Sequence, residues 1–249
     1  MIPRILHRIW MQGPPPPKYD AYWDTFRVHH PSWYLRTWTE EEMQALVTPK
    51  WRALLRQCRL LIQRADIYRC IVLEEYGGVY VDCDMICLKP LDVFLSSTMV
   101  QVGACHGGLL SAFISVNNGI IFAPPKAPVW DDVVVHMSRA FSTQTILDSL
   151  TLVAVLRTTG PWLWSRVKGI VVHPPELFYS LKVSKRKELL PSDYDALHES
   201  YVYHAQAGSW IDGWEGIVMR TVMTPWLLGL LVVLLIVHNK WIRVHPSHN

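Results

Sequence analysis

Two aspartates, Asp82 and Asp84, interrupt a segment that otherwise resembles a buried strand, "EEYGGVYVDCDMICLKPLD". In an extended strand their carboxylates point to the same face, while Cys83 points into the core. Two carboxylates on one face repel each other unless a cation lies between them. Mg²⁺ and Mn²⁺ prefer oxygen ligands and often bind carboxylates together with substrate phosphates. Asp-x-Asp alone occurs by chance in many chains, but here it is interpreted as a platform for a divalent metal and a diphosphate leaving group.

A second pair of charged residues lies upstream, in the segment "RADIYRCIVLEEYGG". Asp66 and Arg69 are three positions apart, so on a helix they share one face. They are either a surface ion pair, worth about a few tenths of a kcal/mol, or part of the same site as the two aspartates. The residues alone leave both interpretations open.

The segments around these residues alternate between expected strands and expected helices. Strands are expected at residues 1–10, 31–38 and 79–84, a strand and turn at 119–125, and short strands with loops in 170–180 and 201–210. Helices are expected at residues 22–30, 39–46, 51–76 and 127–141, and over 145–167 around a break at Gly160 and Pro161. Thr39 is the expected N-cap of the second helix, and Gly77 and Gly78 end the third. This alternation predicts an α/β sheet whose functional residues lie at the ends of strands.

The composition fits a folded domain of ordinary size. The chain has 249 residues, of which 50% are hydrophobic and 18% are charged, and this excludes a disordered chain. The net charge is +3 without a long basic run, so nucleic acid is not an implied partner. The five cysteines are interpreted as small hydrophobic side chains of the interior, not as zinc ligands. They are Cys58, Cys70, Cys83, Cys87 and Cys105.

The C-terminal part of the sequence has a different character. Residues 221–237, "TVMTPWLLGLLVVLLIV", contain no charged residue, and as a helix they would span about 25 Å, slightly less than a bilayer core of about 30 Å. Residues typical of membrane interfaces flank or begin this segment: Arg220, Trp226, Lys240 and Trp241. We expect a membrane anchor, with a helix buried in the protein core as the alternative. The predicted division is a catalytic domain over 1–215 and an anchor with a short tail over 216–249.

Three segments together resemble glycosyltransferase family 32, the group with the Asp-x-Asp sugar-transferase signature. They are "IPRILHRIW", "WYLRTWTEEE" and "RADIYRCIVLEEYGGVYVDCDMICLKPLD". The likeness is dense over residues 2–92 and continues through "NNGIIFAPPKAPVW", "TTGPWL" and "YHAQAGSW" to residue 210. The group includes mannosyl-inositol-phosphorylceramide synthases, Och-type mannosyltransferases and lactosylceramide α-galactosyltransferases.

The resemblance implies a GT-A fold, which is a Rossmann-like nucleotide-sugar-binding α/β fold. It also implies a retaining hexosyl transfer from a nucleotide sugar, Mn²⁺ or Mg²⁺ as cofactor, and a glycan or glycolipid acceptor. The style of the motifs is closest to the mannosyltransferases, which favours GDP-mannose as donor and inositol-phosphoceramide as acceptor. A glycolipid galactosyltransferase that uses UDP-galactose is the alternative. The implied location is a membrane, of the Golgi or endoplasmic reticulum if the source is eukaryotic.

Matching positions carry the family's roles onto this sequence. Asp82 and Asp84 are implied to hold the metal and the ribose or diphosphate. Asp66 and Arg69 are implied to bind hydroxyls of the donor sugar, and Trp10 is implied to lie near the base. Asp66, Arg69 and Asp84 are therefore the expected catalytic residues.

The later motifs have implied roles as well. His204, Ser209 and Trp210 match the motif that closes over the diphosphate, and a neutral imidazole makes His204 a reasonable third metal ligand. A plain loop histidine is the alternative. The stretch 117–119, Asn-Asn-Gly, matches residues near the acceptor, although Asn-Gly also forms turns.

The sequence offers no obvious nucleophile for a double displacement of the kind that retaining glycosidases use. We therefore expect a same-face transfer, in which an oxygen of the departing diphosphate helps to deprotonate the acceptor hydroxyl. The metal and His204 are expected to stabilise the charge on the leaving group.

Other classes of protein are less consistent with the sequence. A Mg²⁺-dependent phosphohydrolase of the haloacid-dehalogenase type also ends a buried strand in Asp-x-Asp. It needs Thr or Val two residues after the second aspartate, where this sequence has Ile86. A non-catalytic nucleotide-sugar-binding protein remains an alternative, but none of the matched positions is missing.

Overall fold

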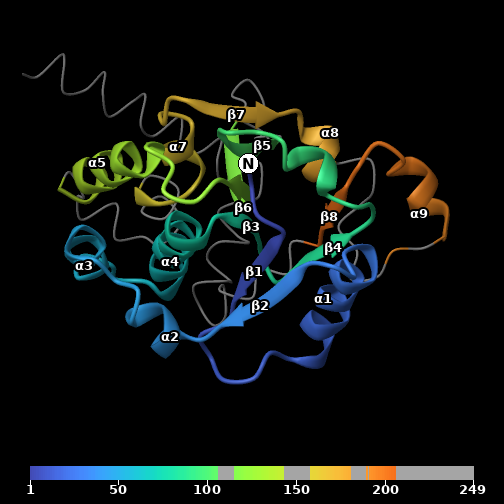
Figure 1. The fold of residues 1–249 in the computed structure, drawn as a ribbon, viewed down its shortest axis with the longest axis horizontal. Coiled ribbons are helices and arrows are strands. Elements are labelled where there is room, and N and C mark those ends of the chain that lie inside the picture. The colour runs from blue at the N-terminus through green and yellow to red at the C-terminus, as the bar shows by residue number, and fades with distance from the viewer. Residues whose placement is uncertain (106–114, 143–157, 181–188, 190, 206–249) are drawn as a thin grey trace, which may run out of the picture. The chain divides into compact units, whose positions relative to one another are not determined.

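A six-stranded mixed sheet forms the centre of the structure, a computed structural model that describes residues 1–105, 115–142, 158–180, 189 and 191–205 (Figure 1). The strand order is β2-β1-β3-β6-β5-β7. Their bounds are β2 Tyr34–Trp38, β1 Ile5–Ile9, β3 Gly78–Val81, β6 Ser115–Ala123, β5 Val100–Cys105 and β7 Ile170–His173. β1 runs parallel to β2 and β3, β5 runs parallel to β7, and β6 is antiparallel to both of its neighbours. The α/β class predicted from the sequence is confirmed.

A separate two-stranded sheet pairs β4, Met85–Cys87, with β8, Val202–His204. Its two strands are antiparallel, with Met85 opposite His204. The chain therefore leaves the central sheet at the end of β3 and enters the small sheet four residues later. The small sheet brings the last described strand next to the turn that follows β3.

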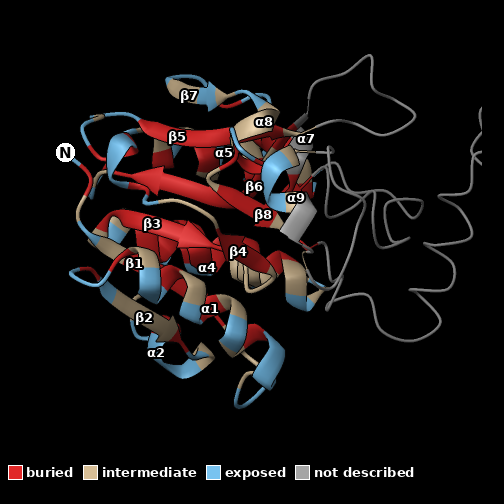
Figure 2. Ribbon diagram, turned by 90° about the vertical axis from the view of Figure 1, so that its right-hand side faces the viewer, coloured by how far each residue is buried: buried red, intermediate tan, exposed pale blue. Residues whose placement is uncertain are grey.

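The helices of the described part lie on both sides of the central sheet. They are α1 Pro17–His29, α2 Glu40–Gln44, α3 Pro49–Leu55, α4 Leu61–Tyr76, the 3₁₀ turn η1 Asp92–Phe94, α5 Val129–Ser142, α7 Pro161–Trp164, α8 Pro175–Phe178 and α9 Pro191–Ala196. One face of the sheet packs on α3, α4 and α5, and the other packs on α1, η1 and α8. The inner strands β3, β6 and β5 are buried on both faces, whereas the edge strands β2 and β7 are partly exposed (Figure 2), as expected for a sheet covered by helices.

Alternation along the strands supplies the two cores. Val79 and Val81 of β3 belong to the core under α1, while Tyr80 belongs to the core under α4. In β6, Ile120 belongs to the core under α1 and Ile121 to the core under α4. Burying both faces explains why these strands read as continuous apolar runs.

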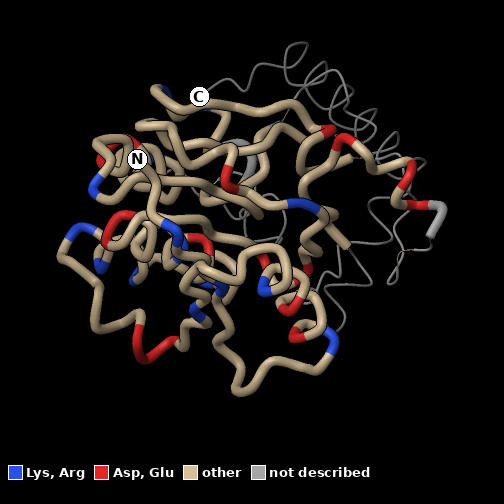
Figure 3. Tube along the Cα trace, turned by 45° about the vertical axis from the view of Figure 1, so that its right-hand side comes forward, with Lys and Arg blue, Asp and Glu red and all other residues tan. Residues whose placement is uncertain are grey.

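Charged residues of both signs are interspersed along the described trace (Figure 3). Lys50 of α3 shows how they link elements, because its Nζ lies 2.7 Å from carboxylate oxygens of both Glu74 in α4 and Asp131 in α5. Glu74 also accepts a hydrogen bond from the indole of Trp51 at 2.6 Å. These contacts fasten the helices that cover one face of the sheet.

Two predicted helix ends are confirmed. Thr39 caps α2, because its hydroxyl accepts from the backbone N–H of Glu42, whose side chain in turn accepts from the backbone N–H of Thr39. Gly77 ends α4 with φ +63°, and its N–H donates to the carbonyl of Leu73. Glycine adopts a positive φ without the steric cost of a side chain.

The helix predicted over 51–76 is wrong as a single element. α3 ends at Leu55 and α4 begins at Leu61. The reason is the side chain of Gln63, whose Oε1 accepts hydrogen bonds from the backbone N–H groups of Arg59 and Leu60 and so caps the start of α4. A side chain that satisfies these N–H groups stabilises a new helix start.

The strand predicted over 79–84 is too long, because β3 ends at Val81. The N–H of Met85 donates to the carbonyl of Asp82 at 3.2 Å, so the two aspartates lie in a tight turn between β3 and β4. In the segment 170–180 the expected short strand is β7, but the short helix α8, which begins at Pro175, stands where a loop was expected. Proline favours the first helical turn.

The cysteines follow the prediction in part. Cys70 and Cys87 are buried, whereas the other three are half-buried, and all five are free thiols. No helix in the described ranges is long and apolar enough to cross a membrane. The predicted anchor at 221–237 and the predicted boundary after residue 215 lie outside the described residues.

Candidate active site

The Asp-x-Asp turn follows the carboxyl end of the inner strand β3 and is hydrogen-bonded to the neighbouring strand β6. The N–H of Asp82 donates to the carbonyl of Gly119 at 2.7 Å, which extends the β3–β6 pairing by one residue. Beyond this bond the chain turns, and Asp84 lies on the far side of the turn. The two side chains retain 26% and 15% of their exposure, so both are half-buried and accessible at the carboxyl end of β3.

The small sheet brings His204 to the aspartates across 120 residues of sequence. His204 pairs with Met85, and the N–H of Ala205 donates to the carbonyl of Asp84 at 2.9 Å. The imidazole Nε2 lies 3.1 Å from Oδ1 of Asp84. Ligand atoms of Asp82, Asp84 and His204 all lie within 4.8 Å of one another. Two carboxylates and an imidazole at this spacing fit a single divalent cation.

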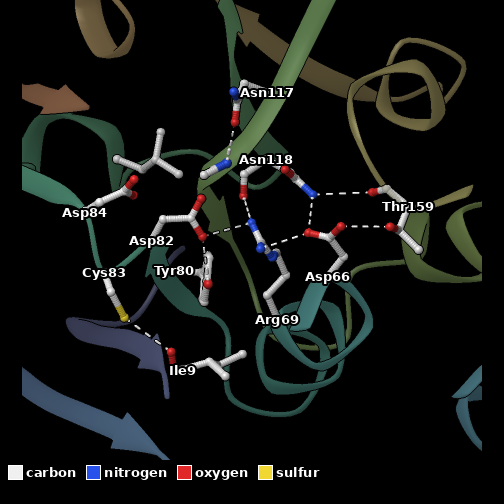
Figure 4. Close-up of polar contacts among 12 residues, drawn as sticks. Ile9, Asp66, Arg69, Tyr80, Asp82, Cys83, Asp84, Asn117, Asn118 and Thr159 are labelled. Carbon is white, nitrogen blue, oxygen red and sulfur yellow. Dashed lines mark hydrogen bonds and ion pairs between the residues drawn. The ribbon is translucent and has the colours of Figure 1, made fainter. Parts of the chain in front are cut away.

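Arg69 lies between Asp66 and Asp82 (Figure 4). Its Nη2 is 2.8 Å from Oδ1 of Asp66, and its Nη1 is 3.2 Å from Oδ1 of Asp82. Nη1 also donates to the backbone carbonyl of Asn118 at 2.5 Å. Asp66 is 3% exposed and Arg69 is 2% exposed. The interpretation of these two residues as a surface ion pair is therefore wrong.

The carboxylate of Asp66 has two further donors. The Asn118 amide donates to Oδ1 at 2.9 Å, and the Thr159 hydroxyl donates to Oδ2 at 2.7 Å (Figure 4). Sequence reasoning did not single out Thr159, because it comes from a segment 93 residues away that precedes α7. The only signal was the threonine pair inside "TTGPWL".

Burial and these donors act in opposite directions on Asp66. Burial raises the pKa of Asp66 to about 6, while Arg69 and the two neutral donors favour the ionised form. Burial also raises the pKa of Asp82, against the opposing charge of Arg69. Both carboxyl groups have donors placed for the carboxylate form.

Tyr80 fixes the same pair from β3. Its hydroxyl donates to Oδ1 of Asp82 at 2.9 Å, and its ring lies 4.6 Å from the guanidinium carbon of Arg69. Burial raises the pKa of Tyr80 well above its usual value of 10, so the hydroxyl stays a neutral donor. Asp82 Oδ1 is thus held by a charged and a neutral donor.

Trp10 and Cys83 lie near the turn. The Cys83 thiol donates to the carbonyl of Ile9 at 3.2 Å (Figure 4), and burial raises its pKa to about 12. It is therefore a neutral thiol that ties the turn to β1, and it does not point into the core. Trp10 follows β1, and its ring is tilted by 43° against that of Tyr19 at a centroid distance of 5.1 Å. Its indole N–H is buried and has no partner among the described residues.

Of the remaining predicted residues, two asparagines lie in the described part of the chain and two residues lie outside it. Asn117 is half-buried and its Oδ1 accepts from the N–H of Gly119 at 2.8 Å, a local contact inside β6 where the register with β5 shifts. The Asn118 amide is engaged by Asp66 and by the carbonyl of Thr159. Ser209 and Trp210 lie outside the described residues.

Comparison with known families identifies the kind of domain that carries this site. Residues 16–101 match the family model described as "Glycosyltransferase sugar-binding region containing DXD motif", a range that includes Asp66, Arg69 and both aspartates of the turn. Residues 16–101 are thus the Asp-x-Asp sugar-binding region of a glycosyltransferase, and this match supports the resemblance to family 32. The motifs of this chain on an α/β sheet, with Asp-x-Asp at the sheet edge, agree with a GT-A-like glycosyltransferase fold.

Several curated proteins are similar to this chain. Inositol phosphoceramide mannosyltransferase 2 of Schizosaccharomyces pombe is 24% identical, over 88% of this chain and 61% of that protein. Mannosyl phosphorylinositol ceramide synthase CSH1 of Saccharomyces cerevisiae is 21% identical, over 94% and 61%. An uncharacterized glycosyltransferase, L373 of Acanthamoeba polyphaga mimivirus, is 28% identical, over 55% and 56%. The chain thus spans about 60% of the length of these relatives.

Solved structures that are similar to the chain include two glycosyltransferases. The PaToxG glycosyltransferase has 15% sequence identity and a TM-score of 0.49, over 67% of this chain and 68% of that chain. The galactosyltransferase LgtC, in complex with donor and acceptor sugar analogs, has 13% identity and a TM-score of 0.44, over 80% and 86%.

Proposed function

We propose that this chain is a metal-dependent, retaining glycosyltransferase that moves a hexose from a nucleotide sugar to a hydroxyl group of a glycolipid. The observation that carries the proposal is the convergence of Asp82, Asp84 and His204 within 4.8 Å at the end of a sheet strand. This arrangement comes from elements 120 residues apart, and it unites three residues that the family resemblance nominates as metal ligands.

The charges of the site fit a divalent ion. Arg69 contacts both Asp66 and Asp82, so this guanidinium and the three carboxylates of Asp66, Asp82 and Asp84 together leave two negative charges beside the imidazole of His204. Mn²⁺ or Mg²⁺ held by Asp82, Asp84 and His204 would neutralise the charge that develops on the departing nucleoside diphosphate. The Tyr80 hydroxyl and Arg69 both contact Oδ1 of Asp82. The other carboxylate oxygen, Oδ2, lies next to Gly119.

The surroundings of Asp66 favour a same-face transfer. Attack by a carboxylate needs a free oxygen close to the anomeric carbon, yet Oδ1 and Oδ2 of Asp66 both accept hydrogen bonds from the protein. Asp66 is also almost fully buried. An oxygen of the departing diphosphate is therefore the better candidate to take the proton of the acceptor hydroxyl. His204 and the aspartates orient the diphosphate for this step.

Donor and acceptor are proposed from the relatives. Two of the similar proteins are named as an inositol phosphoceramide mannosyltransferase and a mannosyl phosphorylinositol ceramide synthase. This favours mannose from GDP-mannose and an inositol-phosphoceramide acceptor. Such an acceptor lies in a membrane, which fits the predicted anchor at 221–237 and a location in the Golgi or endoplasmic reticulum of a eukaryotic cell.

Three aromatic or hydroxyl residues complete the proposed donor site. We assign Trp10 to the neighbourhood of the nucleotide base, since its indole N–H is buried without a partner among the described residues and a planar ring can stack on a base. Ser209 and Trp210 are assigned to the diphosphate through the family motif alone.

The test is a panel of nucleotide sugars incubated with the purified protein and Mn²⁺, with release of nucleoside diphosphate as the signal. GDP-mannose, UDP-galactose and UDP-glucose form the panel. We expect release from GDP-mannose only, reduced more than about 100-fold in Asp84→Ala because loss of a ligand costs more than an outer-shell change. Asp24→Asn is the control, since Asp24 is exposed on α1 and pairs only with Arg27 among the described residues.

Release of nucleoside diphosphate from UDP-galactose alone would contradict GDP-mannose as the donor and indicate a galactosyltransferase. Equal release from Asp84→Ala and wild type would refute the proposed metal site. Folded protein that binds GDP-mannose in calorimetry, yet transfers nothing to inositol-phosphoceramide in membranes, would instead indicate a non-catalytic binding protein.

A further inference from the structure

A buried hydrogen-bond network connects the Asp-x-Asp turn with α4, β6 and the segment before α7. It runs from the Thr159 hydroxyl to Asp66, from Asp66 to Arg69, and from Arg69 to Asp82 (Figure 4). Asn118 closes the network, because its amide donates to Asp66 and its carbonyl accepts from Arg69. Thr159, Asp66, Arg69 and Asn118 are each less than 10% exposed, whereas Asp82 at the end of the network is half-buried.

We propose that Thr159 and Asn118 are positioning residues which hold the Asp66–Arg69 pair as a clamp on Asp82. In this view Asp66 and Arg69 act on the metal site through Asp82. The inference rests on the proposed function, since it assigns the network to the metal ligand Asp82.

The contacts of Asp66 support a role inside the protein. Its Oδ1 accepts from Arg69 and Asn118, and its Oδ2 accepts from Thr159 at 2.7 Å. A carboxylate with three protein donors and 3% exposure is held in one orientation by the protein itself. Loss of one donor would leave a buried carboxylate oxygen unsatisfied, which disturbs the neighbours that share its charge.

The contacts of Arg69 show how the clamp reaches the metal ligand. One guanidinium nitrogen, Nη1, contacts both the Asn118 carbonyl and Oδ1 of Asp82. Tyr80 stacks on the guanidinium and donates to the same Oδ1. Asp82 is thereby restrained in orientation, and partners of this kind typically change metal affinity when they are removed.

The backbone around Thr159 is itself fixed from α4. Gln63 Nε2 donates to the Thr158 hydroxyl at 3.0 Å, and both side chains are buried. The neighbouring Thr159 carbonyl accepts from the Asn118 amide at 3.3 Å. Thr159 therefore donates to Asp66 from a segment that is bound at two adjacent residues, as expected of a group that sets geometry.

Mn²⁺ binding tests the inference without any sugar. The full chain is titrated with Mn²⁺ in the presence of GDP and, separately, UDP, and free Mn²⁺ is followed by electron paramagnetic resonance. Thr159→Val removes the hydroxyl at constant shape, and we expect the Mn²⁺ affinity to fall about tenfold. Thr159→Ser keeps the hydroxyl and should restore the affinity to within about twofold of wild type.

Thr37→Val is the matched control. The Thr37 hydroxyl accepts a hydrogen bond from Arg8 at 2.7 Å. The same substitution there removes the hydroxyl partner of an arginine that lies outside the network. We expect Mn²⁺ affinity to remain that of wild type. Asp66→Asn provides a second variant. It removes the negative charge that offsets Arg69, so the positive charge of Arg69 would repel the cation, and we expect the Mn²⁺ affinity to fall at least about tenfold.

The opposite result overturns the clamp. If Thr159→Val and Asp66→Asn bind Mn²⁺ and GDP as wild type does, but lose affinity for GDP-mannose relative to GDP, the pair contacts the sugar. If wild type itself binds no Mn²⁺ with either nucleotide, the proposed metal site fails and the clamp fails with it. The two failures are therefore distinguishable by the wild-type titration alone.

Discussion

At Gly119 the backbone of β6 passes so close to the Asp82 carboxylate that a side chain has no room. A Cβ atom there would lie 2.8 Å from Oδ2 of Asp82, 3.0 Å from Cε of Met85 and 3.1 Å from the Tyr179 hydroxyl. The Tyr179 hydroxyl is itself fixed, since it accepts from the N–H of Ile120 at 3.0 Å. Glycine is needed here for close approach of the backbone to the site.

Gly119→Ala should therefore damage the site more than the fold. We expect the added methyl group to displace Asp82, with Mn²⁺ affinity and transfer rate each reduced at least about tenfold. Gly13→Ala is the control for backbone strain away from the site: nothing lies within 4 Å of its added Cβ, but its φ of +87° strains an alanine, so we expect lower stability with wild-type Mn²⁺ affinity. Thermal unfolding monitors stability, and wild-type Mn²⁺ binding in Gly119→Ala would contradict the steric argument.

Local chemistry made some of these residues predictable, and tertiary contacts hid others. The Asp-x-Asp pair could be found because two carboxylates in an apolar run need a physical reason. The burial of Asp66 and Arg69 could not be found, because i, i+3 spacing is the same for a surface pair and for a buried one. Thr159 had no local signal at all, since its role depends on contacts with a helix 93 residues earlier.

At the scale of elements, His7 joins three parts of the sheet region. It lies on β1, its Nδ1 accepts from the indole N–H of Trp38 at 3.0 Å, and its Nε2 lies 2.8 Å from the carbonyl of Gly77. Because the indole is only a donor, the proton of the imidazole is on Nε2, which donates to Gly77. Neutral His7 therefore links β1 to β2 and to the end of α4.

This link makes stability depend on pH in a defined window. Burial lowers the pKa of His7 from 6.5 to about 4. Between these values the unfolded chain binds more protons than the folded one, so the contribution is complete above pH 6.5 and is lost as the pH falls toward 4. The difference corresponds to about 3 kcal/mol.

His7→Gln should flatten this dependence. The amide retains a donor for the Gly77 carbonyl but does not titrate, while the other histidines are unchanged in the variant. We expect urea unfolding at pH 7.5 to show a loss of about 1–2 kcal/mol, together with a smaller decrease between pH 6.5 and 4 than in wild type. Parallel pH profiles for the two proteins would contradict a buried, neutral His7.

Element boundaries were predictable where the signal is local. The cap at Thr39 and the stop at Gly77 depend on residues within four positions of the helix end. The break between α3 and α4 depends on the Gln63 side chain, which accepts a hydrogen bond from the backbone before α4. The pairing of β4 with β8 joins strands that are more than 100 residues apart. Short strands with such separations give no periodic signal that identifies their partner.

At the scale of the whole described unit, the proposed functional residues gather at one edge of the sheet. Trp10 follows β1 and Asp82 follows β3, which is parallel to it. Asn118 lies near the start of the antiparallel β6, which meets the same edge. Carboxyl ends of parallel strands are the usual place for ligands in open α/β sheets, and here a separate small sheet adds His204 to that edge.

The predicted anchor is the property of the whole chain that most needs a direct test. Residues 221–237 carry no charge, so we expect the full-length protein to partition into the detergent phase of a Triton X-114 separation. Leu231→Arg with Leu234→Arg should move it to the aqueous phase, since each arginine costs about 2.5–3.5 kcal/mol at the centre of a membrane helix. The matched double alanine variant should stay with the detergent. Wild-type protein in the aqueous phase would contradict the anchor and favour a helix packed against the protein's own core.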